Sequence, residues 1–281
     1  MLYGLVPNAV RGAYTSGVPP VESTFFRTSA VAVCFALVVI ARGESFRVPT
    51  AAWPSLVGQT VSTLVVSVGY LASVQFIPVG LAAIIFFTFP VLIMLAAPLV
   101  EGHKPGRIRT LIACFAFAGL AVSVGPSFEA LDIRGILLAA AASAFCALQF
   151  FSGRQLSQYM TPMAFGSLVH LMIWPATLAI ALLASNGTIQ LFPGGTGTAA
   201  GLAFVAGGGA IYLVAYLIHM LSLRFASASI VAPFFNLEPI VATAVAALFL
   251  GERLAPNQYV GGGMVLAALM ISRRLTAHQN G

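Results

Sequence analysis

Long apolar stretches follow one another through most of this sequence, separated by short turns rich in proline and glycine. Hydrophobic residues make up 59% of the chain and charged residues only 7%, whereas about a quarter of a soluble globular domain is charged. The 281 residues have room for about ten spans of roughly 20 residues each. Because lipid offers the backbone no hydrogen-bond partners and the stretches lack β-barrel alternation, we predict an all-α membrane protein.

We expect ten transmembrane helices, with boundaries uncertain by a few residues. The expected spans are residues 2–16, 23–41, 53–76, 79–100, 107–124, 133–153, 162–184, 198–223, 226–250 and 256–272. The first is shorter than the others, which suggests that the protein begins upstream of Met1. No cleavable signal peptide is evident, because the first residues lack a basic segment and a small-residue cleavage site.

Basic residues gather on one side when the loops are assigned to alternate sides of the membrane. One side carries Arg42, Arg47, Lys104, Arg107, Arg109, Arg154, Arg224, Arg273 and Arg274, and the other carries only Arg134 and Arg253. Since basic loops stay in the cytoplasm, we expect both chain ends there and a location in the bacterial inner (plasma) membrane. These residues dominate the net charge of +6, which therefore indicates a lipid bilayer as partner and no nucleic acid.

The chain contains an internal repeat, in which residues 70–102 align with residues 219–251 without a gap. The register pairs Ser73 with Ser222, Phe86 with Phe235, and Pro90 with Pro239. Shared composition of apolar helices is the alternative explanation. A common mid-helix proline argues against it, because proline removes a helical hydrogen bond that has to be compensated each time.

Each copy of the repeat holds five spans, which divides the chain into residues 1–125 and 126–281. An odd number of spans forces the second copy to enter the membrane in the opposite sense to the first. We therefore predict two inverted five-helix repeats. In such proteins interrupted helices flank a binding site near the midplane, and Pro90 and Pro239 mark those helix-break positions.

The segment 249–266, FLGERLAPNQYVGGGMVL, resembles the closing part of an EamA-type domain of the drug/metabolite transporter superfamily. The residues that match the family pattern are Pro239, Leu250, Gly251, Glu252, Gln258 and Gly261. The first copy departs from it, because its corner reads Val100-Glu101-Gly102-His103 and the following glutamine is missing. The resemblance implies a ten-helix secondary transporter for amino acids, related metabolites or drugs.

Glu238 lies about midway along the ninth expected span. A carboxylate at this depth costs on the order of 3 kcal/mol or more unless it is protonated, paired or hydrated. We expect it to be the one buried acid, to face an interior cavity, and to bind a proton or a cationic group of the substrate. A structural ion pair with Arg11 or Arg27 is the alternative.

Further candidates for the substrate site are Asn236, Tyr212, Tyr216, Gln59 and Phe86. Tyr212 and Tyr216 share one helix face and can stack on a solute, although interfacial anchoring is an equal alternative. For Asn236 the alternative is an interhelical hydrogen bond, and for Phe86 it is packing.

The sequence offers no catalytic or cofactor-binding motif, so we expect a carrier of small molecules and no enzyme. The three cysteines lie within apolar stretches without metal-ligand spacing, so we expect them to be small buried packing residues, and we expect no metal site or cofactor. The rival classes are an intramembrane enzyme and a non-transporting membrane scaffold. A homodimer is compatible with the sequence.

Overall fold

The computed structural model describes residues 2–102, 106–125, 132–185, 187, 198–250 and 255–279, and every regular element among them is helical. The elements are η1 Leu2–Leu5, α1 Val6–Thr15, α2 Pro20–Ala41, η2 Thr50–Ala52, α3 Trp53–Ser73, α4 Val79–Phe86, α5 Phe89–Val100, α6 Arg107–Val124, α7 Ile133–Leu156, α8 Pro162–Ala184, α9 Thr198–Phe225, α10 Ala228–Val231, η3 Ala232–Asn236, α11 Leu237–Leu250 and α12 Pro256–Gln279. The predicted all-α membrane class is confirmed for this part of the chain.

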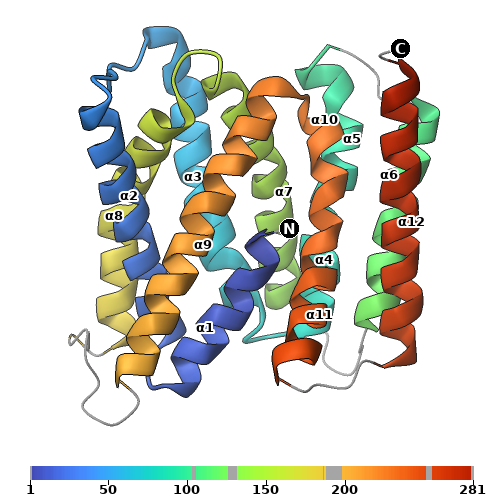
Figure 1. Ribbon diagram of the computed structural model, residues 1–281, viewed down its shortest axis with the longest axis horizontal. Helices are drawn as coiled ribbons and strands as arrows, with labels where there is room; N and C mark the ends of the chain where they lie inside the picture. Colours follow the sequence, from blue (N-terminus) through green and yellow to red (C-terminus); the bar gives the residue numbers. More distant parts are fainter. Residues whose placement is uncertain are drawn as a thin grey trace.

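Eight helical segments in the described ranges are long and apolar enough to cross a membrane. They are Val21–Ala41, Thr50–Tyr70, Val79–Val100, Arg107–Val124, Ile133–Leu156, Pro162–Ala184, Ala199–Phe225 and Ala228–Val245. The first and last of the ten expected spans are not among them. The first forms η1 and the ten-residue α1, and the chain starts at mid-height of the bundle instead of at one end (Figure 1).

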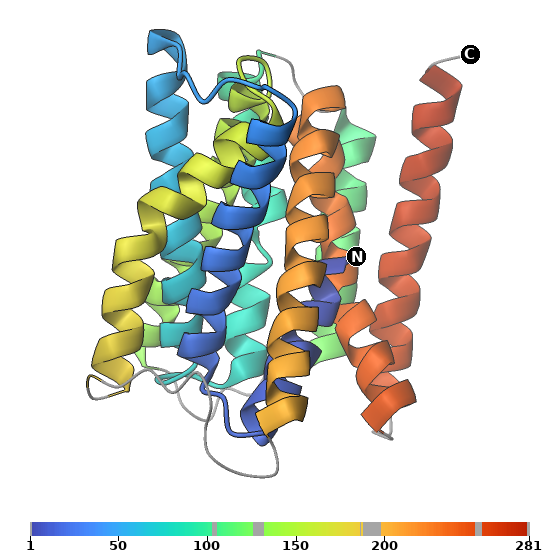
Figure 2. The same ribbon diagram turned by 60° about the vertical axis from the view of Figure 1, so that its left-hand side comes forward.

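The helices form one upright bundle, with α8 and α12 at opposite edges (Figures 1 and 2). At one end, drawn uppermost in Figure 1, α2, α5, α7 and α9 finish and α6 begins. Because Arg42, Arg107, Arg154 and Arg224 lie at these helix ends, we call it the basic end. At the far end α1 finishes and α7 begins with Asp132 as its N-cap.

The most extensive helix contacts join α3 with α7, α6 with α12, α2 with α8, and α1 with α9. In every pair one helix comes from residues 1–125 and the other from residues 126–281. The contact of α12 with α6 is close enough that a Cβ atom at Gly261 would collide with the carbonyl oxygen of Gly119. The two parts of the chain therefore interlock instead of packing as separate bodies.

Two helices are interrupted in the middle of the bundle. The first stops at Phe86 and resumes at Phe89, and Pro90 follows directly in the new first turn. In the second, α10 passes into the 3-10 segment η3, and α11 then starts with Pro239 in its first turn. Proline has no N–H to donate to the carbonyl four residues earlier, which explains a break at each place. Figure 1 shows that α4–α5 and α10–α11 run in opposite directions.

Candidate functional site

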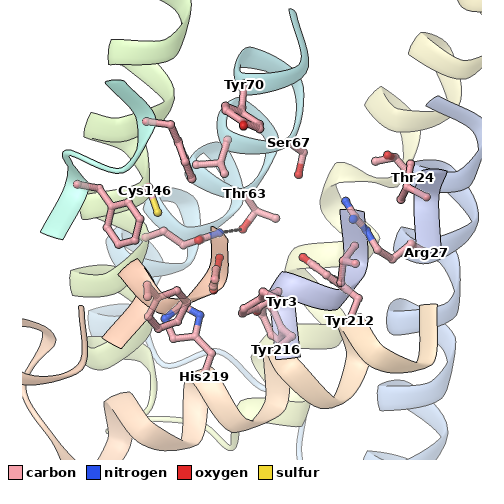
Figure 3. Close-up of a pocket in the computed structure, with 18 of the residues that line it drawn as sticks. Tyr3, Thr24, Arg27, Thr63, Ser67, Tyr70, Cys146, Tyr212, Tyr216 and His219 are labelled. Atoms are coloured by element: carbon pink, nitrogen blue, oxygen red, sulfur yellow. Dashed lines mark hydrogen bonds between the residues drawn. The ribbon is translucent and has the colours of Figure 1, made fainter. Parts of the chain in front are cut away.

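A cavity of about 530 Å³ lies inside the bundle, enclosed by helices from both parts of the chain (Figure 3). Side chains of α3 line it on one side, and side chains of α9 face them from the other. Rings and aliphatic groups make up most of its wall, with a few polar groups between them. A mostly apolar cavity with sparse, placed polar groups is typical of a binding site for a small organic molecule.

The lining positions of α3 and α9 correspond under the register of the internal repeat. On α3 they are Thr63, Ser67 and Tyr70, and on α9 they are Tyr212, Tyr216 and His219. The register that pairs Pro90 with Pro239 also pairs Thr63 with Tyr212, Ser67 with Tyr216, and Tyr70 with His219. Equivalent faces of the two helices are therefore turned toward the same cavity.

A chain of polar contacts runs beneath the α3 side of the cavity. Gln149 on α7 donates from Nε2 to Thr63 Oγ1 at 2.9 Å, and Thr63 Oγ1 donates to the Gln59 carbonyl at 2.7 Å. The Gln59 side chain is fully buried behind the cavity wall, where its Nε2 lies 3.7 Å from the sulfur of Met220. Gln59 thus lies one layer outside the cavity, whereas Thr63 and Gln149 line it.

Both tyrosines of α9 reach the cavity from the bundle interior. Tyr216 is 1% exposed and Tyr212 is half-buried, so neither lies at the membrane surface as an anchor. His170 on α8 contacts the Gly166 carbonyl through Nδ1 at 2.7 Å and the Tyr212 hydroxyl through Nε2 at 3.4 Å. The guanidinium of Arg27 lies over the Tyr212 ring, 4.3 Å from its centroid.

Aromatic rings close the cavity on one side. The rings of Phe89, Phe150, Phe235 and His219 pack on each other with centroid distances of 4.4–6.1 Å. Phe86 joins this cluster through Phe89, at 5.6 Å, and also lines the cavity. Phe86 therefore both packs and contacts the cavity, which makes its two predicted roles compatible.

Beyond the aromatic cluster, an ionic network ties helix ends together at the basic end. The Glu101 carboxylate, whose side chain is 5% exposed, accepts from the Ala228 backbone N–H at 2.7 Å and from the Ser229 hydroxyl at 3.1 Å. Arg154 Nε lies 3.5 Å from the same carboxylate, and its Nη1 donates to the carbonyls of Leu223 and Ala226. The network joins the ends of α5, α7 and α9 to the start of α10.

The opposite side of the cavity extends toward the far end of the bundle. Its wall there includes Arg11 and Tyr14 on the last turns of α1, and Tyr14 is 62% exposed. In this structure the cavity therefore extends toward the far end, while the aromatic cluster and the Glu101–Arg154 network lie on its basic-end side.

Glu238 lies in the first turn of α11 and lines the cavity. Within the described residues, its Oε1 atom is buried without a hydrogen-bond partner, and its carboxylate makes no ion pair with Arg11 or Arg27. Its own backbone is pressed against η1, because a Cβ atom at Gly4 would collide with the Glu238 carbonyl. Tight backbone packing thus fixes the position of the carboxylate.

Asn236, the other polar residue predicted on this helix, is fully buried at the end of η3 but does not line the cavity. Neither its Oδ1 nor its Nδ2 atom has a hydrogen-bond partner among the described residues. The structure therefore does not contain the interhelical hydrogen bond that we considered as an alternative. A buried amide without partners destabilises the state in which it occurs.

Two sequence-based expectations need correction. Glu238 was expected to be the single buried acid, but Glu22 is 2% exposed in the first turn of α2 and Glu101 is nearly as buried. Both lie near helix ends, and a residue near the end of a predicted span is expected to contact water. The cysteines were expected to be buried, but Cys34 and Cys114 are exposed and only Cys146 is buried. Residues 251–254 of the EamA-like segment lie outside the described residues.

Sequence reasoning did not select Arg27 and Gln149 as site residues. Arg27 was considered only as a structural partner of Glu238, although an arginine inside an apolar span is itself a sign of an interior site. Gln149 gave a weaker signal, a lone amide in the sixth expected span. Arg154 was interpreted only as a topology signal, because its partner Glu101 is distant in sequence and the contact depends on tertiary structure.

Comparison with known proteins identifies the family. The sequence matches the EamA-like transporter family over residues 1–125 and 133–274, which together make up most of the chain. The chain belongs to this family. The resemblance drawn from the closing segment is thereby confirmed, and the family description is that of a transporter and not of an enzyme.

Curated relatives of this EamA-like protein include the threonine/homoserine exporter RhtA of Escherichia coli strain K12. The two are 25% identical over 200 residues, which cover 70% of this chain and 63% of RhtA. RhtA of Escherichia coli O157:H7 matches to the same extent. The match thus spans less than two thirds of these relatives. A solved crystal structure with 17% identity has a TM-score of 0.81 over 98% of this chain and 94% of its own, which shows the same fold.

Proposed function

We propose that this protein is a secondary transporter that carries small organic solutes, such as amino acids or related metabolites, by alternating access. The observation that carries the proposal is the interior cavity, whose wall holds an acidic side chain with an Oε1 atom that has no hydrogen-bond partner among the described residues, and which has the Glu101–Arg154 network on its basic-end side. The relationship to a threonine/homoserine exporter supports amino acids as the first solutes to test and export as the direction.

The proposed architecture is ten membrane-embedded segments in two inverted five-helix repeats, residues 1–125 and 126–281. Exchanging the repeats turns the α3–α7 contact into the α9–α1 contact and leaves the α2–α8 and α6–α12 contacts unchanged. The opposite directions of the two interrupted helices also support this plan. Rocking of one repeat against the other would then expose the cavity to each side in turn.

The basic end is assigned to the cytoplasm of a bacterial inner membrane, following the positive-inside rule. The structure then corresponds to an outward-facing state, with the Glu101–Arg154 network closed on the cytoplasmic side. α12 ends at the basic end, in agreement with a cytoplasmic C-terminal end (Figure 1). That the N-terminus lies in the cytoplasm and that the protein forms a homodimer are still predictions.

Within this transporter, Glu238 is proposed to bind the coupling proton or the ammonium group of the solute. A carboxylate inside an apolar cavity is stabilised by protonation or by a cation, so it has a physical reason to exchange one for the other. The sequence contains no nucleotide-binding motif, which favours a gradient as the energy source. We expect the structure to need no cofactor for this cycle.

The test is uptake of radiolabelled L-threonine, followed by a panel of other amino acids, into proteoliposomes with an imposed pH gradient. Glu238→Gln should abolish accumulation driven by the gradient, because the amide cannot take up a proton. Glu44→Gln is the matched control, since Glu44 lies in a loop at the basic end and contacts Thr161 outside the cavity. Accumulation by Glu238→Gln that equals wild type at every gradient would remove Glu238 from the mechanism. A wild-type protein that moves no solute at all would favour the scaffold alternative.

A further inference from the structure

Arg27 is the polar residue of the cavity that the proposed proton coupling leaves unexplained. It belongs to α2, about two turns from the end of that helix at the far side, and its side chain lines the cavity. Figure 3 shows it reaching from α2 toward Tyr212, on the same side of the cavity as Thr24. The position is inside an apolar helix and far from the basic end, where Arg42, Arg47, Arg107 and Arg109 of the same repeat lie.

The contacts of Arg27 leave its hydrogen-bonding groups available. Its Cζ atom lies over the Tyr212 ring, 4.3 Å from the centroid, which is within cation–π distance. In the described part of the chain, no carboxylate lies within ion-pair distance of Arg27, and no hydrogen bond from its five N–H groups is found. A stacked guanidinium keeps its planar edge free, and that edge is the part that binds a planar anion through two parallel hydrogen bonds.

The surroundings indicate what kind of anion fits. Tyr3 packs against Tyr212 with ring centroids 5.6 Å apart and lies within electrostatic range of both Arg27 and Glu238. The cavity wall thus carries two cationic groups, Arg11 on α1 and Arg27 on α2, and an acidic group on α11, with tyrosine rings among them. Arg11 already has an interaction partner in the structure. A carboxylate carries one charge and matches one guanidinium, whereas a phosphate dianion usually needs a second cation or a helix N-terminus.

We propose that Arg27, held over Tyr212, is the carboxylate-binding group of the cavity, so that the transported solutes carry a free carboxylate. This inference rests on the proposed transport function and narrows its substrate class. An amino acid has the required carboxylate, its α-carboxylate, whereas a simple amine or an uncharged metabolite has none. Arg27 then recognises the solute, and Glu238 binds the proton or the ammonium group.

The experiment compares two acids with their primary amides: L-threonine with L-threoninamide, and L-phenylalanine with L-phenylalaninamide. The amides keep the ammonium group and the side chain but lose the negative charge. Competition against a transported radiolabelled amino acid in proteoliposomes gives an apparent affinity for each. Wild type should prefer the acid by about tenfold or more, since a charge-assisted hydrogen-bond pair is lost with the amide.

Arg27→Gln should reduce this preference to about onefold to threefold. The amide should still inhibit uptake of the radiolabelled amino acid by this variant, which also shows that the variant is folded. Arg27→Lys should retain part of the preference, because it keeps the charge but loses the planar fork. Arg42→Gln is the matched control, since Arg42 ends the same helix and its side chain is 61% exposed. This control should keep the wild-type preference.

The outcomes separate the two proposals. A wild-type protein that transports the amide as well as the acid, or an Arg27→Gln variant that keeps the preference, overturns the carboxylate inference and leaves transport standing. Inhibition by inorganic phosphate at lower concentration than by either acid would assign Arg27 to phosphate and also overturn it. If wild type moves none of the four solutes, both proposals fail.

Discussion

The two interrupted helices of this protein share their backbone design and differ in the side chains at the break. Tyr70 packs on Phe86 at 4.9 Å in the first half, and His219 packs on Phe235 at 4.6 Å at the equivalent positions of the second. Ser73 Oγ donates to the Tyr70 carbonyl at 2.7 Å, as Ser222 Oγ does to the His219 carbonyl at 2.6 Å. The same local geometry is thus built twice.

At the break itself the two halves diverge. The positions of Phe87 and Phe89 in the first half correspond to those of Asn236 and Glu238 in the second. Phe89 is 1% exposed within the aromatic cluster, whereas Glu238 lines the cavity with an Oε1 atom that has no hydrogen-bond partner among the described residues. The comparison teaches that the break is a property of the repeat, while the polar chemistry belongs to one copy only.

The largest effect is expected when the acid is added to the half that lacks it. Phe89→Glu places a carboxylate among Phe150 and Phe235 and should lower the free energy of unfolding by on the order of 3 kcal/mol. Thermal denaturation of the detergent-purified protein measures it, with Phe89→Leu as the apolar control. If both variants unfold at the same temperature, the first break tolerates an acid and the asymmetry does not come from its environment.

A smaller effect on stability is expected when the buried amide of Asn236 is removed from the break in the second half. Asn236→Leu eliminates a buried amide without described partners, so this state should gain about 1 kcal/mol of stability. The transport rate should fall if the amide finds a partner in the inward-facing state. Asn8→Leu is the matched control, because Asn8 donates to the Ala242 carbonyl at 3.2 Å and its loss should destabilise. A destabilised Asn236→Leu protein would contradict this prediction.

The smallest effect concerns how the two halves begin. α7 is capped by Asp132, which accepts from the Arg134 backbone N–H at 2.8 Å, whereas α1 has no side-chain cap. The hydrogen bond from the Arg134 side chain lowers the pKa of the Asp132 carboxyl. A carboxyl with a lowered folded-state pKa stabilises the fold above its unfolded pKa and loses this contribution as pH falls through the folded value.

We therefore expect a small loss of thermal stability as pH falls below about 4, which Arg134→Gln should reduce. This loss is measured as the change in denaturation temperature between pH 3 and pH 7, for wild type and for the variant. Identical pH profiles for the two proteins would mean that the ionised pair does not contribute. The effect is small because the pair lies in water at the bundle end.

Much of the fold follows from the sequence because apolar length is a strong signal. The expected spans 107–124 and 162–184 coincide with α6 and α8, and the repeat register placed the equivalent prolines. The first expected span forms η1 and α1, fourteen helical residues from Leu2 to Thr15, which is shorter than the roughly 20 residues of a full span.

The candidate site was harder to predict, because periodicity shows which face of a helix is polar but not which helices meet. Tyr212, Tyr216, Phe86 and Glu238 line the cavity, while Gln59 and Asn236 lie behind its wall. These two amides are polar side chains within apolar helices, and only their tertiary position keeps them out of the cavity wall. The pairing of Glu101 with Arg154 likewise depends on a contact between distant segments.

The carboxylate of Glu101 has a mechanical consequence. It lies at the end of the first interrupted helix and caps the start of the second, so a single side chain connects the two interrupted helices. Any motion that opens this end must either release this connection, leaving the first turn of α10 uncapped, or carry α5, α7 and α10 along as one rigid block. The first route would admit water and dissolved ions to the Arg154 pair, and opening would then respond to ionic strength, whereas the second would leave the pair dry and insensitive to salt.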